Sequence, residues 1–160
     1  MAINDVSPAG LIGTTQANFD SIEATLGNGV LNVARFQFDT AIAANKATGA
    51  HGVGISIRAN AVIVGGFYEV NTAFTSTNST ATIAISVVGA NDIVTATAVS
   101  NAIYGTIGRK AIVPKANTPE STSIKVGSAA KEITCTVAVE ALTAGKLNGY
   151  LYYVPGDATA

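Results

Sequence analysis

The stretch Ala81-Thr82-Ile83-Ala84-Ile85-Ser86-Val87 decides the fold of this chain. Its odd-numbered positions are all apolar, and its even-numbered positions carry Thr, Ala and Ser. Successive side chains of a β-strand point to opposite sides, so this alternation places the apolar set on one face. Val, Ile and Thr are also the residues that strands favour. The stretch therefore predicts a half-buried strand of an antiparallel sheet.

The same two-residue period returns on both sides of this stretch. It recurs in residues 31–38, 53–58 and 133–140, and further strand candidates cover residues 61–70, 93–100, 109–113, 121–126 and 146–154. Turn-forming residues separate these segments at positions 73–78, 89–92, 114–119 and 127–128. Roughly eight or nine short strands in this arrangement predict an all-β fold, an antiparallel β-sandwich or jelly roll.

Two local features refine this prediction. Gly65-Gly66 lies inside a strand candidate, which indicates a β-bulge or a close approach of two backbones. Residues 40–50 are rich in Ala and show neither period clearly, so we expect a loop or one more helical turn there.

The first 29 residues have a helical period instead. Ser7-Pro8 is a favourable helix start, and Gly27 is placed to end the helix. Between them, apolar residues recur at spacings of three and four, which predicts a narrow stripe on one helix face. This stripe contains Ile12, Phe19, Ile22 and Leu26. A short helix of this kind is marginal alone, so we expect an N-terminal arm (residues 1–29) whose stripe contacts a partner or the single β-sandwich domain (residues 30–160).

The composition suits a structural protein. The chain has 160 residues, of which 48% are hydrophobic and only 12% are charged. That charged fraction is about half of the average for globular proteins. A surface so poor in charge indicates that part of it is buried against other chains.

Several partner classes have no support in the sequence. The net charge is −1 and the basic residues are scattered, so we expect no nucleic-acid binding. No run approaches about 20 apolar residues, and we expect no membrane span. The first residues lack the pattern of a signal peptide, so we expect synthesis in a cytosol.

No catalytic constellation stands out. His51 is the sole histidine, and a Ser–His–Asp site would have to combine it with residues such as Ser56 and Asp39. No Gly-x-Ser-x-Gly motif is present. We therefore expect no catalytic residues and interpret His51 as a loop or strand-edge residue. A small hydrolase that uses His51 is kept as a remote alternative.

Metal and cofactor sites are not expected either. One histidine and one cysteine, Cys135, are too few for a zinc site, and no intrachain disulfide can form. Cys135 occupies an apolar position of its strand candidate, so we expect a buried thiol. Asn91-Asp92 alone is too small a cluster for calcium.

A resemblance to a known family is carried by a series of strand and turn patterns. These are residues 65–70, the Thr- and Ser-rich segment 72–82, residues 83–87, 91–94, 109–114, 141–147 and 150–154. This part, somewhat more than half of the chain, resembles small virion structural proteins of tailed bacteriophages, in particular capsid decoration (cement) proteins.

The resemblance implies a β-sandwich or jelly-roll unit without activity or cofactor. It also implies a homotrimer on the exterior of a phage head, with the major capsid protein as its partner and synthesis in the bacterial host cytoplasm. A phage tail-fibre, baseplate or host-receptor-binding module is the alternative. It would be favoured by a glycan-binding groove lined by tyrosines, namely Tyr68, Tyr104, Tyr150, Tyr152 or Tyr153.

Overall fold

The computed structural model describes residues 31–114 and 123–156 of the chain. Strands dominate this part, joined by one short 3₁₀ helix (η1) and one short α-helix (α2). In chain order the elements are β1 (Asn32–Asp39), η1 (Ala43–Lys46), β2 (Gly49–Ile57), β3 (Val62–Ser76), β4 (Thr82–Ser86), β5 (Val94–Ala98), α2 (Ala102–Gly105), β6 (Gly108–Ile112), β7 (Ile124–Lys125), β8 (Lys131–Ala138) and β9 (Leu142–Val154).

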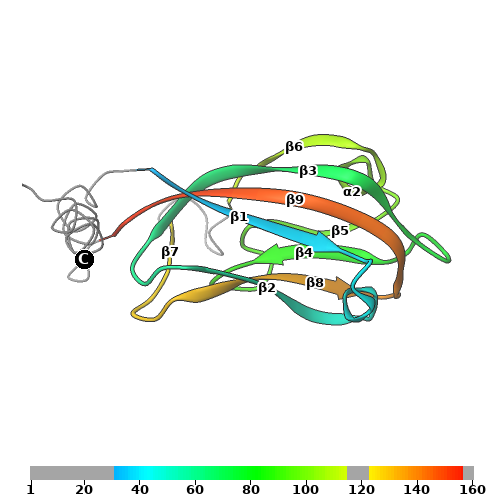
Figure 1. Ribbon diagram of the computed structural model, residues 1–160, viewed down its shortest axis with the longest axis horizontal. Helices are drawn as coiled ribbons and strands as arrows, with labels where there is room; N and C mark the ends of the chain where they lie inside the picture. The colour runs from blue at the N-terminus through cyan, green and yellow to red at the C-terminus, as the bar shows by residue number, and fades with distance from the viewer. Residues whose placement is uncertain (1–30, 115–122, 157–160) are drawn as a thin grey trace, which may run out of the picture.

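The strands form two antiparallel sheets packed face to face (Figure 1). The five-stranded sheet has the order β1-β9-β3-β6, with β7 paired to β3, and the four-stranded sheet has the order β2-β8-β4-β5. The chain crosses from one sheet to the other between β1 and β2, β2 and β3, β3 and β4, β5 and β6, β7 and β8, and β8 and β9. This winding is the jelly-roll topology, so the predicted all-β class and architecture are confirmed.

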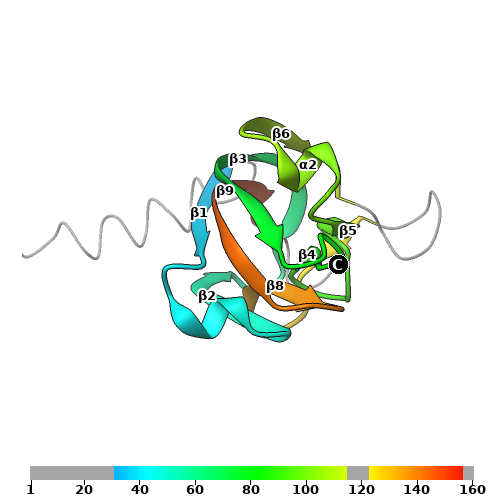
Figure 2. The same cartoon turned by 90° about the vertical axis from the view of Figure 1, so that its right-hand side faces the viewer.

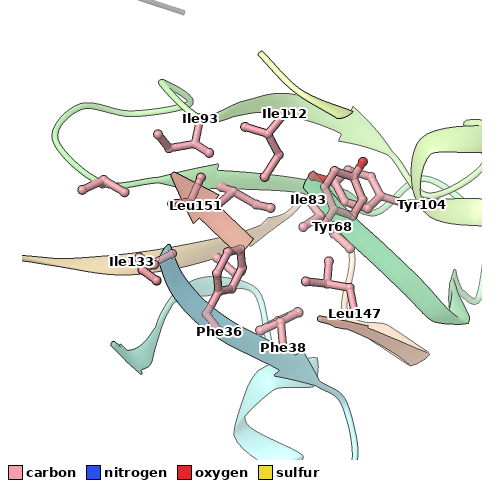
Figure 3. Packing of buried hydrophobic residues seen from close by; sticks show 14 of the residues in the cluster. Phe36, Phe38, Tyr68, Ile83, Ile93, Tyr104, Ile112, Ile133, Leu147 and Leu151 are labelled. Atoms are coloured by element: carbon pink, nitrogen blue, oxygen red, sulfur yellow. The ribbon is translucent and has the colours of Figure 1, made fainter. Parts of the chain in front are cut away.

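The core fills the space between the sheets, as Figure 3 shows for its larger side chains. Phe36 and Phe38 enter it from β1, Ile83 and Ile85 from β4, and Leu147 from β9. In β4 and directly beside it, the residues predicted to point inward (Ala81, Ile83, Ile85 and Val87) are all buried, and Ala84 on the opposite face is buried as well. The period of two in the sequence therefore identified the inward face of this strand correctly.

Strand β3 is longer than the sequence indicates. Residues 73–78 were expected to form a turn, but β3 continues to Ser76 and pairs there with Leu142 of β9. Strand β9 likewise begins at Leu142 and not at Lys146. Backbone pairing between two long neighbouring strands outweighs the turn preference of a segment rich in Thr and Ser.

Two apolar residues predicted to point inward do not. Ile55 of β2 is 36% exposed, because the register with β8 shifts between Gly52 and Ser56. Val139 is 74% exposed, since β8 ends at Ala138 and Val139 has a positive φ of 72° in the following turn. The register shift in β2 and the turn after β8 each interrupt the alternation of inward and outward side chains.

The expected irregularity at Gly65-Gly66 is confirmed. The register between β3 and β9 shifts between Ile63 and Gly65. A Cβ at Gly66 would overlap the backbone carbonyl of Tyr150, so the two backbones approach too closely for any other residue. The helix α2 was not expected, and its first turn is capped by the side chain of Asn101, which accepts a hydrogen bond from Ile103 N.

The N-terminal arm, with Ile12, Phe19, Ile22 and Leu26, lies outside the described residues. Within the described residues, no helix is long and apolar enough to cross a membrane.

Candidate binding surface

A row of stacked side chains crosses the outer face of the five-stranded sheet. Tyr150 of β9 and Phe67 of β3 are direct cross-strand partners, and their rings stack with centroids 4.6 Å apart. The guanidinium of Arg35 from β1 lies 5.8 Å from the Tyr150 ring, and that of Arg109 from β6 lies 5.2 Å from the Phe67 ring. We call Arg35, Tyr150, Phe67 and Arg109 the stacked row.

The stacked row presents positive charge and ring edges. Each ring is covered by the other ring on one side and has a guanidinium over it as well. Cation–π contact leaves the guanidinium N–H groups at the edge available for a carboxylate. Both arginines are exposed, and neither forms an ion pair within residues 31–114 and 123–156. Glu69 is the cross-strand partner of Arg109 on this face, so the Arg35 end of the row is the more positive one. The row is therefore suited to a partly apolar partner that carries acidic groups.

Apolar and polar groups flank the stacked row on either side. On one side, Tyr152 lies edge-on to Phe67 with centroids 6.2 Å apart, beside its cross-strand partner Val33, which is 53% exposed. On the other side, Asn148 joins neighbouring strands by accepting a hydrogen bond from Gln37 (2.9 Å) and donating one to Asn71 (2.8 Å). The outer face thus changes from apolar to polar along the strands.

A further pair lies beyond this polar group. Lys146 forms a salt bridge of 2.9 Å with Asp39. A hydrogen bond from Ala41 N and this lysine lower the pKa of Asp39. A surface ion pair of this kind contributes little to stability, because water screens the two charges. The charge of Lys146 is therefore paired with that of Asp39, but the pair adds little to the free energy of unfolding.

The tyrosines do not form one groove. Tyr68 and Tyr104 stack on each other in the core, 5.7 Å apart, and both are buried (Figure 3). Burial raises the pKa of Tyr68 to about 12, and it also raises that of Tyr104 well above its ordinary value. Only Tyr150, Tyr152 and Tyr153 are partly exposed. Because the rings of Tyr150 and Phe67 cover each other, the exposed set is also a poor stacking platform for a sugar.

His51 is an edge-strand residue, as expected. It lies in β2, an outer strand of its sheet, and its Nε2 is 2.8 Å from the Ala47 carbonyl oxygen. Its ring packs against Phe38 with centroids 6.0 Å apart. Asp39 is engaged with Lys146 and Ala41 N, and Ser56 makes no hydrogen bond to His51. The three residues of the remote hydrolase alternative are not brought together.

Cys135 is fully buried, and burial raises the pKa of its thiol to about 12. A thiol with so high a pKa is a poor nucleophile at neutral pH. Among the described residues, no group of three or more His, Cys, Asp or Glu side chains is arranged to hold a metal ion.

One surface carboxylate has a structural role that the sequence did not reveal. Glu140, after β8, accepts hydrogen bonds from Asn78 N (3.0 Å), Asn78 Nδ2 (2.9 Å) and Thr80 Oγ1 (3.0 Å). Hydrogen bonds from Ser76, Asn78 and Thr80 lower its pKa to about 2. The carboxylate thus fastens the β3–β4 turn to the β8–β9 turn.

Glu140→Gln is expected to destabilise the protein at pH 7, because the neutral amide replaces a charged acceptor. The folded-state pKa of about 2 lies below the ordinary value of 4.5, so the carboxylate stabilises above pH 4.5 and loses this effect as pH falls toward 2. Urea unfolding at pH 7, 4 and 2.5 should show the difference from wild type shrinking with acidity. Glu69→Gln is the control, since Glu69 accepts no hydrogen bond within the described residues and should differ little from wild type at pH 7. A difference for Glu140→Gln that is constant with pH would contradict this assignment.

The sequence did not point to the stacked row. Arg35, Phe67 and Arg109 each occupy the outward position of an alternating strand, which was the one available signal. An aromatic residue at an outward position indicates a covered surface only after the register of its neighbours is known.

Comparison with protein families gives no match, and comparison with curated protein sequences gives none. Solved structures do match. A chain in the capsid of Ralstonia phage GP4 is 17% identical with a TM-score of 0.59, over 81% of this chain and 87% of that one. A chain in the capsid asymmetric unit of cyanophage Pam1 is 20% identical with a TM-score of 0.55, over 80% of this chain and 86% of that one. A chain in the acidic stable capsid of Helicobacter pylori bacteriophage KHP30 is 11% identical with a TM-score of 0.54, over 81% and 91%. At these identities the chains share a fold.

Proposed function

We propose that this chain is a non-enzymatic virion structural protein of a tailed phage, and that it is a capsid decoration (cement) protein. It would bind the outer surface of the phage head and stabilise it. The observation that carries the proposal is the fold shared with chains of phage capsids.

The extent of that likeness supports a small capsid component. The match covers 80–81% of this chain and 86–91% of the phage chains, so those chains are close to this one in length. The shared unit is therefore nearly the whole of each chain, and not a domain within a much larger protein. A fold, however, hosts many functions, so the surface has to supply the rest of the argument.

The surface suits docking better than catalysis. His51, Cys135 and the rings of Tyr68 and Tyr104 are each explained by packing, and the Tyr104 hydroxyl is buried without a hydrogen-bond partner among the described residues. Large apolar side chains are exposed in several places, among them Val64 (53%), Ile107 (70%) and Val113 (71%). Exposed apolar side chains, together with arginines that form no ion pair with the described residues, are typical of a surface that another chain covers.

The proposal includes the assembly. The chain would form a homotrimer and contact the phage major capsid protein from the capsid exterior, after synthesis in the host cytoplasm. Threefold positions of a capsid suit a trimer, because each subunit then makes the same contact. The arm residues Ile12, Phe19, Ile22 and Leu26 would contribute to attachment or to the contact with a neighbouring subunit.

The test is to add the purified chain to heads of its phage that lack it. We expect saturable binding, a higher melting temperature of the heads, and a trimer mass by light scattering. Deleting residues 2–27 should weaken head binding while the circular dichroism of the β-sandwich is retained. Equal binding by the truncated chain would remove the arm from the mechanism. No binding by the full chain, together with its location on tails by cryo-electron microscopy, would favour the tail-fibre or receptor-binding alternative.

A further inference from the structure

We propose that residues 1–30 fold back onto the outer face of the five-stranded sheet of their own chain. In this arrangement the apolar stripe lies against the Phe67 and Tyr152 region, and the acidic side chains of the segment meet Arg35 and Arg109. The inference concerns the isolated chain and does not depend on the proposed function.

Charge complementarity is the first argument. Residues 1–30 contain three acidic residues, Asp5, Asp20 and Glu23, and no Lys or Arg. All nine basic residues of the chain lie after residue 30, although its net charge is only −1. Of these, Arg35 and Arg109 are exposed on the outer face and form no ion pair within the described residues. The same face also carries Glu69, the cross-strand partner of Arg109, and the Lys146–Asp39 pair. Its basic side chains (Arg35, Arg109 and Lys146) still outnumber its acidic ones (Asp39 and Glu69), whereas the segment has acidic side chains alone.

The second argument is the match of side-chain types. Phe19 and Glu23 are four positions apart, so on the helix that their spacing predicts they would be neighbours. The face combines aromatic rings with a basic group, where the segment combines an aromatic ring with an acidic one. Phe67 has the Arg109 guanidinium over its ring and Tyr152 at its edge. A guanidinium that rests on a ring still offers its edge N–H groups to a carboxylate. The aromatic and apolar groups can meet while the charges pair.

The segment also joins the sheet close to this face. It enters β1 directly before Leu31 and Val33, which are each 53% exposed and lie at the end of the sheet where β9 finishes (Figures 1 and 2). The sequence Gly27-Asn28-Gly29 permits a reversal of the chain at that point. The four strands of the stacked row span roughly 15 Å at about 4.8 Å per strand, which a helix of about 1.5 Å per residue easily covers.

These connections favour the same chain over a second copy. A tethered segment faces its site at an effective concentration of about millimolar, well above that of a separate molecule in dilute solution. The sequence Gly27-Asn28-Gly29 permits the reversal that would let the segment reach the face of its own chain.

Photo-crosslinking of the full chain tests directly whether residues 1–30 lie on the outer face of the five-stranded sheet. Benzoylphenylalanine replaces Tyr152 on the outer face, and in a control it replaces Ser56, which is exposed on β2 of the other sheet. Unlabelled and ¹⁵N-labelled protein are unfolded and refolded together, so that any oligomer contains both kinds of chain, and the mixture is irradiated and digested for mass spectrometry. We expect crosslinks from position 152 to residues 1–30 of the same isotopic chain, and none of these from position 56. Absence of crosslinks to residues 1–30, or crosslinks only between unlike isotopic chains, would overturn the proposal.

The rate at which a protease cleaves the segment gives a second, independent test of its pairing with Arg35 and Arg109. Arg35→Gln combined with Arg109→Gln should speed cleavage after Glu23 by a glutamyl endopeptidase about threefold to tenfold, as expected for the loss of two exposed charge contacts. Arg58→Gln combined with Lys131→Gln makes the same change of charge at exposed positions away from this face and should leave the rate unchanged. Equal cleavage rates in the two double variants would contradict the pairing.

Discussion

Ile85→Ala is expected to lower the free energy of unfolding by roughly 2–5 kcal/mol. Ile85 has no exposed surface, and it lies on β4 between Cys135 of β8 and Val94 of β5. Its truncation removes buried apolar atoms and leaves a cavity, because a central strand with neighbours on both sides cannot move in to fill the space. Denaturation with urea, monitored by circular dichroism, measures the change.

Thr82→Ala in the same strand is the matched control. Thr82 is only half-buried, on the side of β4 that faces away from the core. Its replacement should cost less than about 0.5 kcal/mol. Equal midpoints for the two variants would show that the inward and outward faces of β4 have been exchanged.

Asp92→Ala is expected to cost roughly 2–4 kcal/mol, because it removes the acceptor of three backbone N–H groups. Asp92 is 3% exposed, and its carboxylate accepts hydrogen bonds from Val87 N, Val88 N and Gly89 N, each at 2.9 Å. These bonds hold the turn between β4 and β5 closed. Without the carboxylate, the N–H group of Val87 loses its partner in a buried place, and those of Val88 and Gly89 lose theirs in a partly buried one.

Asp92→Asn separates the loss of charge from the loss of the acceptor. The amide keeps one oxygen and has no charge, so it can satisfy only part of the three bonds. Its stability should lie between those of wild type and Asp92→Ala in thermal and urea unfolding. An Asp92→Ala variant as stable as wild type would mean that the turn closes without its carboxylate.

The strand prediction succeeded where local and tertiary preferences agree. In β1, β4 and β8 the β-branched and aromatic residues recur at every second position, and the structure buries those positions. The strand prediction failed where backbone pairing with a neighbouring strand decides whether a segment is strand or turn. Residues 73–76 (Ala-Phe-Thr-Ser) form strand because β9 extends alongside them, and nothing within this segment predicts that β9 will be its neighbour.

The candidate surface shows the same division. Each member of the stacked row is an ordinary outward residue in the sequence, and the four are brought into one row only by the order β1-β9-β3-β6. Glu140 likewise joins two turns only because the fold brings it next to Asn78 and Thr80, which lie 60 or more positions away in the sequence. Neither the stacked row nor the contacts of Glu140 can be predicted from the residues that are neighbours in the sequence.

By itself, then, the sequence determined the all-β class, the inward faces of β1, β4 and β8, and the buried thiol of Cys135. These properties follow from the period and the type of residues within short segments, and such segments carry their own preferences. Only the tertiary structure decided the jelly-roll strand order, the length of β3, the burial of Tyr68 and Tyr104 and the stacked row on the outer face. Those properties depend on which strands lie side by side and in what register, and a period of two fixes the face of a strand without naming its neighbour.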